Sequence, residues 1–123
     1  MKNLTGAATL LRIFVGERDK YKHQPLYEAI VLFAKRHGMA GATVLRGLMS
    51  YGANSTIHSA KLFALSEDLP IIVEIVDEED KINDFVKQLE PFFESSAYGG
   101  LVTLEKIRVI YYQAVKGNDS AGR

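Results

Sequence analysis

The sequence predicts an α+β domain, a ferredoxin-like βαββαβ sandwich in which an antiparallel sheet carries two helices on one face. The length of 123 residues suits one domain with one core. Segments rich in β-branched residues alternate with two segments of helical periodicity. We expect a single domain over residues 9–112 and flexible tails at 1–8 and 113–123, because the tails hold little apolar surface to offset the entropy of ordering them.

The first half of the predicted fold is a strand, a helix and a second strand. Residues 10–15 read Leu-Leu-Arg-Ile-Phe-Val, a composition typical of a strand. The first helix begins at Pro25, where the missing N–H costs nothing, and ends at Gly38. Residues 42–51 return to strand, and residues 54–66 are ambiguous, with a weak strand pattern.

The second half repeats this order. Residues 70–76 form a strand rich in β-branched residues, and the acidic run from Asp77 opens a helix, where negative charge suits the positive end of the dipole. Pro91 bends or ends that helix. A loop over residues 95–100 then leads to a last strand over residues 101–112.

Both faces of the predicted sheet are apolar, although two helices can cover only one of them. We assign to the helices the side chains of Leu11, Ile13, Val15, Leu45, Met49, Ile71, Val73, Ile75, Ile107, Val109 and Tyr111. The opposite face then holds Leu10, Arg12, Phe14, Val44, Arg46, Leu48, Ile72, Glu74, Val76, Arg108, Ile110 and Tyr112. This second face is too apolar to remain in water, so we expect other subunits to cover it.

Each strand places one charged residue on that second face. If the third strand lies between the first and the second, Glu74 is within reach of Arg12 and Arg46. An ion pair buried there would set the register of the assembly more than it would stabilise it. Alternatively, the charges lie at the rim, with their stems packed and their heads hydrated. The sequence leaves both interpretations open.

The composition excludes several classes of function. Fifteen basic and fifteen acidic residues leave no basic excess for nucleic acid, and the absence of cysteine excludes disulfides and thiolate chemistry. The three histidines lack metal-ligand spacing, so we predict no metal site. No nucleophile pattern or carboxylate pair is visible, so we predict no enzyme and no catalytic residue. Without a signal-like or membrane-spanning segment, we expect a cytoplasmic protein that does not insert into membranes.

Four segments resemble the uncharacterised PII-like domain family. They are Leu-Leu-Arg-Ile-Phe-Val-Gly-Glu (10–17), Pro-Leu-Tyr-Glu-Ala-Ile (25–30), Gly-Ala-Thr-Val-Leu-Arg-Gly (41–47) and Glu-Asp-Leu-Pro-Ile-Ile-Val-Glu-Ile-Val-Asp (67–77). The similarity runs from about Leu10 to Tyr112. It implies a trimer like those of the nitrogen-regulatory PII proteins and of CutA, whose sheets face inward. In PII proteins, adenine nucleotides bind between subunits, and a loop after the second strand reports the bound state to a target.

The resemblance also suggests positions for a ligand site. The turn that opens the PII loop corresponds to Met49, Ser50, Tyr51 and Gly52, and the glycine-rich turn before the last strand corresponds to Gly99, Gly100, Leu101 and Val102. Glycines let backbone N–H groups converge on an anion. Leu101 stands where PII proteins carry a lysine, and the lysine of their third strand is also missing, which disfavours a triphosphate. The candidate replacement cations are Arg12, Arg46, Lys61 and Arg108, and His58 is the best-placed histidine for a ligand contact.

The resemblance therefore implies a homotrimeric regulatory protein whose small-molecule effector is an adenine nucleotide (ADP, AMP or ATP). Occupancy of the cleft between subunits would reorder residues 53–66 and change the affinity for a membrane transporter or an enzyme. The same segment also fits a plain hairpin at the rim. Two alternatives remain open: a CutA-like trimer with a metal-related or structural role, and a small dimeric isomerase on the same scaffold.

Overall fold

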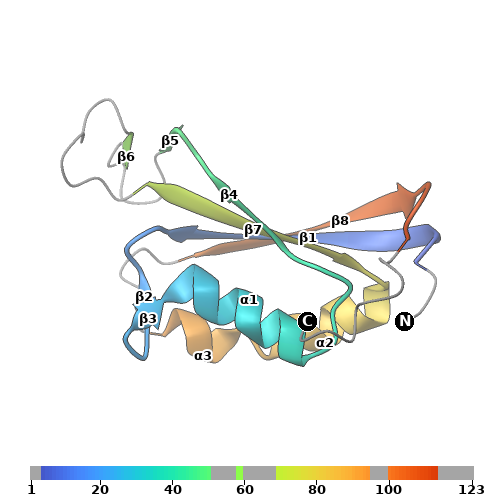
Figure 1. Ribbon diagram of the computed structural model, residues 1–123, viewed down its shortest axis with the longest axis horizontal. Coiled ribbons are helices and arrows are strands. Elements are labelled where there is room, and N and C mark those ends of the chain that lie inside the picture. Colours follow the sequence, from blue (N-terminus) through green and yellow to red (C-terminus); the bar gives the residue numbers. More distant parts are fainter. Residues whose placement is uncertain (1–3, 51–57, 60–68, 95–99, 114–123) are drawn as a thin grey trace.

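The computed structural model describes residues 4–50, 58–59, 69–94 and 100–113. One layer is a four-stranded antiparallel sheet with the order β4-β7-β1-β8, and the other layer is helical (Figure 1). The sheet strands are β1 (Gly6–Gly16), β4 (Thr43–Arg46), β7 (Pro70–Asp77) and β8 (Leu101–Val109). Because β7 lies between β1 and β4, the strand order is that of a ferredoxin-like sheet, as predicted.

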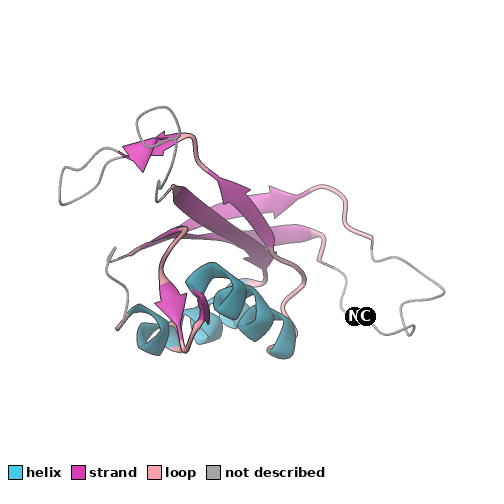
Figure 2. Cartoon of the chain, turned by 60° about the vertical axis from the view of Figure 1, so that its left-hand side comes forward, coloured by secondary structure: helices cyan, strands magenta, loops and turns pink. Residues whose placement is uncertain are grey.

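Three helices lie on one side of this sheet (Figure 2). They are α1 (Leu26–Arg36), α2 (Glu79–Lys87) and the short α3 (Glu90–Phe93). Pro91 lies in the first turn of α3, so the proline ends one helix and starts another. Asp77 links the two halves of the fold, because its carboxylate accepts N–H bonds from Ala40 at 2.9 Å and from Glu78 at 2.7 Å.

Two short hairpins extend the fold. β2 (Lys20–Tyr21) pairs with β3 (Gln24–Pro25) beside the helix layer, and Pro25 then precedes α1. β5 (Met49–Ser50) pairs with β6 (His58–Ser59). The second hairpin gives strand structure to residues 58–59 of the ambiguous segment, and the remainder of 54–66 lies outside the described residues.

The core fills the space between the sheet and the helices. In β1 and β7, every second side chain is buried, and the residues predicted to face the helices are confirmed, with at most 3% of their surface exposed: Leu11, Ile13, Val15, Ile71, Val73 and Ile75. They pack against Leu26, Ile30, Ile82 and Phe85 from the helices. Burial of each such side chain contributes about 1.5–3 kcal/mol, so this interface dominates the stability of the fold.

The face assignments for β4 and β8 were wrong. Val44 lies opposite Val73, on the helix side, whereas Leu45 lies opposite Ile72, on the other side. In β8, Ile107 lies opposite Ala8, so Ile107 shares the face of Leu10 and Arg12 rather than the face of the core. Because side chains alternate along a strand, a one-residue error in phase reverses a whole strand.

The strand ends also differ from the predicted ones. β1 begins at Gly6, so the domain boundary expected at residue 9 falls inside a strand, and Leu4 before it is only 6% exposed. β8 ends at Val109, three residues before the predicted end, because the chain bends at Ile110. Tyr111 and Tyr112 therefore follow the last strand instead of belonging to it.

Candidate functional site

The sheet has one face that α1, α2 and α3 do not cover (Figure 1), which we call the bare face. Its apolar residues come from all four strands: Leu10, Phe14, Leu45, Ile72, Val76, Leu101, Ile107 and Val109. Two of them are among the most exposed apolar side chains of the strands, Leu45 at 44% and Leu101 at 55%. An apolar surface that crosses a whole sheet is typical of a protein interface.

An ion-pair cluster lies in the middle of the bare face. Arg12 on β1 is directly opposite Glu74 on β7, and the Arg12 Nε lies 2.9 Å from Glu74 Oε2. The Arg12 Nη1 lies 3.0 Å from Glu105 Oε1 on β8. The hydrogen bond with Glu74, reinforced by the one with Glu105, raises the pKa of Arg12 above its usual value. Arg12 and Glu74 lie on the two central strands of the sheet, so neither residue is at the rim.

The sequence left open whether Arg46 lies within reach of Glu74, and in the structure it does not. Arg46 lies opposite Ile71, on the helix-covered side of the sheet. Its Nη2 lies 2.7 Å from Glu17 Oε2, just beyond the end of β1. Of the two cations predicted near Glu74, only Arg12 is there.

Arg46 belongs to a second region, which we call the loop end. At this end of the sheet β1 and β4 finish and β7 and β8 begin. Arg46 and Gly47 therefore lie at the end of one edge strand, β4, and Gly100 and Leu101 lie at the same end of the opposite edge strand, β8. β5 continues directly from β4 there. The loop end thus holds a cation and two glycine turns, which are elements that an anion site uses, with β7 and β1 between Gly100 and the other two residues.

The glycines of the loop end also serve packing. A Cβ at Gly47 would lie 2.7 Å from the Pro70 ring, and the Gly47 N–H donates to the Pro70 carbonyl at 2.7 Å. A Cβ at Gly100 would lie 2.7 Å from the Phe93 ring. Glycine therefore lets β4 approach β7 at Gly47 and lets the chain before β8 approach α3 at Gly100, closer than a side chain at either position allows.

The predicted ligand residues fall into separate places. Arg46, Met49, Ser50, Gly100, Leu101 and Val102 lie at or next to the loop end. Arg12 lies mid-sheet, and Arg108 lies opposite Ala7, near the other end. His58 lies in β6, where its backbone pairs with Ser50. Tyr51, Gly52, Lys61 and Gly99 lie outside the described residues.

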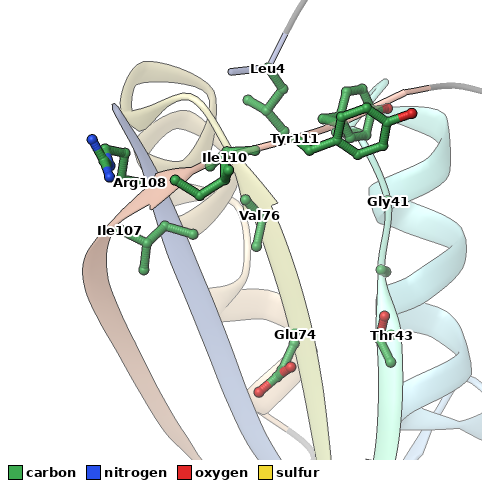
Figure 3. Close-up of a pocket in the computed structure, with 13 residues that line it drawn as sticks. Leu4, Gly41, Thr43, Glu74, Val76, Ile107, Arg108, Ile110 and Tyr111 are labelled. Atoms are coloured by element: carbon green, nitrogen blue, oxygen red, sulfur yellow. The ribbon is translucent and has the colours of Figure 1, made fainter. Parts of the chain in front are cut away.

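A groove of about 700 Å³ lies on the bare face at the end opposite the loop end. Thr43, Glu74, Val76 and Ile107 line its floor, and the segment after β8, including Tyr111, passes beside them (Figure 3). The sequence interpretation missed this groove, because it continued the last strand straight through Ile110. The bend turns the chain across the sheet instead.

The described residues hold no group of three His, Asp or Glu side chains arranged to bind a metal. In the same part of the chain, no helix is both long and apolar enough to cross a bilayer.

Comparison with known proteins gives a consistent family and fold. The model of the DUF190 family, described as Uncharacterized ACR, matches residues 8–109. A UPF0166 protein of Aquifex aeolicus is 41% identical over 102 residues, covering 83% of this chain and 92% of the relative. The UPF0166 protein MJ1524 of Methanocaldococcus jannaschii is 34% identical, covering 83% and 91%.

Among solved structures, the chain resembles CPII, a nitrogen regulatory PII-like protein from Thiomonas intermedia K12 bound to ADP, AMP and bicarbonate. The TM-score is 0.64, with 21% identity over 84% of this chain and 88% of CPII. At this identity the likeness concerns the fold alone, and it agrees with the PII-like architecture expected from the sequence.

Proposed function

The chain belongs to the DUF190 family, and from this premise we propose that it is a regulatory protein of the PII-like kind. Three copies assemble through their bare faces. An adenine nucleotide (ADP, AMP or ATP) binds in each cleft between subunits, and its presence alters the affinity for a partner, a transporter or an enzyme of the cytoplasm. The protein acts by binding and catalyses no reaction.

The bare face is the observation that carries the proposal. It exposes apolar side chains on all four strands, and a monomer would leave them in water. Removal of apolar surface from water contributes about 25 cal/mol per Å², so contact with further copies is strongly favoured. In a closed assembly, each copy shields the others.

The loop end supports the nucleotide part of the proposal. It places Gly47 and Arg46 on one edge strand and Gly100 before the other edge strand, all at the same end of the sheet. CPII has the same fold and was solved with ADP and AMP. A neighbouring subunit on the bare face would cover this end of the sheet.

The charge of the loop end favours nucleotides with fewer phosphates. Leu101 is apolar at the start of β8, and the guanidinium of Arg46 already pairs with Glu17. Each further phosphate adds negative charge that needs a cation or N–H partner. We therefore expect AMP or ADP to bind more tightly than ATP.

Two measurements test the proposal. Sedimentation equilibrium should give a particle of three chains, and calorimetric titration with AMP, ADP and ATP should give one site per subunit for at least one of them. A monomer at micromolar concentration would reject the assembly. A trimer that binds none of the three nucleotides would reject the nucleotide as effector and leave the assembly standing.

A further inference from the structure

The bare face carries an unequal number of positive and negative charges. In the described sheet, the register places three charged residues on this face: Arg12, Glu74 and Glu105. One cation therefore faces two carboxylates. The nearest other basic residues of β8, Lys106 and Arg108, lie opposite Thr9 and Ala7, on the helix-covered side of the sheet.

The two carboxylates share one guanidinium unequally. Glu74 lies directly opposite Arg12, receives its Nε–H, and has a side chain that is 28% exposed. Glu105 lies opposite Leu10 on the edge strand, receives an Nη1–H at 3.0 Å, and is 58% exposed. Water thus stabilises the second carboxylate more than the first in the single chain.

The contact with Arg12 turns the Glu105 carboxylate inward, over the sheet. The residues beside it on the same face of β8 are Thr103 and Ile107, which carry no charge. A partner that covers the bare face therefore removes water from Glu105. A second copy brings the same excess of negative charge on its own bare face, where its Arg12 already pairs with its own Glu74 and Glu105, so it offers no further cation to replace that water.

A carboxylate that loses water without gaining a cation takes up a proton instead, because its neutral form costs far less to bury. We propose that assembly through the bare face is coupled to proton uptake at Glu105, one proton per subunit. Arg12 and Glu74 then form a neutral pair, and the protonated Glu105 still accepts the Arg12 N–H. This inference rests on the proposed assembly and adds that the assembly responds to pH.

The sign of the effect follows from linkage. The assembled state holds more protons than the free chains, so association strengthens as the pH falls from 8 towards 5. The limiting slope is about tenfold per pH unit for each subunit that takes up a proton.

The test is sedimentation equilibrium of the full chain at pH 8, 7, 6 and 5, for the wild type, Glu105→Gln and Glu28→Gln. Gln keeps an oxygen for Arg12 and removes the excess charge. We expect Glu105→Gln to assemble more tightly than the wild type at pH 8, and to lose most of the pH dependence. Glu28, exposed on α1 in the helix layer, provides the control with the same change of charge. It should behave as the wild type.

Each other outcome contradicts the inference. Weaker assembly of Glu105→Gln at pH 8 would mean that a partner subunit supplies a cation to Glu105. Unchanged assembly would mean that Glu105 stays hydrated at the rim. If Glu105→Gln does not fold, Glu105→Thr replaces it, since Thr103 already occupies the same face of β8. A wild type that is monomeric throughout would reject the proposed assembly itself, whereas a trimer indifferent to pH would reject only the proton uptake.

Discussion

Arg46 and Glu17 form an ion pair at the loop end, with Nη2 and Oε2 2.7 Å apart, on the helix-covered side of the sheet. The Glu17 side chain is 26% exposed and that of Arg46 is 59% exposed. The pair joins the residue after β1 to the last residue of β4, two segments that β7 separates. Any anion that approaches Arg46 must therefore compete with a carboxylate of the same chain.

The first prediction concerns this competition. Glu17→Gln should strengthen binding of ADP, because the amide leaves the full positive charge of Arg46 to the phosphates. Charge-assisted hydrogen bonds contribute about 1.5–3 kcal/mol each, and because the Arg46 side chain is exposed we expect the low end of this range, about a tenfold lower Kd in calorimetric titration at low salt. Arg46→Gln should have the opposite effect.

The control for this prediction is Lys35→Gln, which removes an exposed cation in the last turn of α1, away from the sheet. It should leave the Kd unchanged. If the wild type, Glu17→Gln and Arg46→Gln bind ADP with equal affinity, Arg46 does not contribute to the nucleotide site.

The second prediction concerns the Arg12 cluster. Arg12→Leu leaves Glu74 and Glu105 together without their cation, so assembly should weaken at pH 8 and recover as the pH falls. Glu74→Leu should keep the subunit folded and assembled, because Arg12 still pairs with Glu105. The Arg12→Leu variant has no guanidinium in this cluster, so the recovery belongs to the carboxylates of Glu74 and Glu105 alone. Sedimentation of Arg12→Leu identical to that of the wild type would contradict this account.

The sequence predicts which face each side chain occupies better for the central strands than for the edge strands. In β1 and β7, Arg12 and Glu74 mark the bare face correctly, because the helix layer fully covers the other face and excludes charge there. At the sheet edges, the same rule fails. Arg46 on β4 and Arg108 on β8 lie on the helix side, where the strands reach beyond the helices and both side chains are exposed. A charged residue identifies the uncovered face of a strand only where the helices exclude water from the opposite face.

In the candidate site, too, some features have a local sequence signal and others do not. The turn at Gly100 was identified because glycine carries a local signal, whereas Gly47, at the same end of the sheet on the opposite edge strand, was not singled out. The Arg46–Glu17 pair joins residues 29 positions apart, and the groove depends on the bend at Ile110. Neither of these features has a local sequence pattern, so only the tertiary structure reveals them.

The third prediction concerns the glycines of the loop end. Gly47→Ala places a methyl group 2.7 Å from the Pro70 ring, and Gly100→Ala places one 2.7 Å from the Phe93 ring. Each overpacked contact should cost about 1–3 kcal/mol of unfolding free energy. Gly41→Ala is the control, since nothing lies within 4 Å of its added Cβ, and it should be neutral or slightly stabilising. Urea denaturation measures all three, and equal midpoints would show that the loop end adjusts without cost.

The last prediction concerns the turn between β2 and β3. Lys22 and His23 occupy its two central positions with φ of 48° and 71°, so both adopt the left-handed conformation. A two-residue turn of this kind prefers Asn-Gly, because in the left-handed conformation the Cβ atom crowds the following carbonyl oxygen, glycine has no Cβ, and the short polar side chain of Asn tolerates this conformation. The hairpin nonetheless packs against the helix layer, since the ring centroids of the neighbouring Tyr21 and of Phe92 are 4.6 Å apart.

Replacing Lys22 by Asn and His23 by Gly should therefore relieve about 1–2 kcal/mol of backbone strain. Loss of the contact between the Lys22 amine and the Tyr21 ring, whose centroid is 5.3 Å away, removes about 0.5–1 kcal/mol, so the net increase in the free energy of unfolding should be about 1 kcal/mol at most. Lys20→Asn on β2 removes the same charge without relaxing the turn, so it should not stabilise the protein. A lower denaturation midpoint for the double variant than for Lys20→Asn would contradict this prediction. It would show that the side chains of Lys22 and His23 stabilise the protein by more than the left-handed backbone of the turn destabilises it.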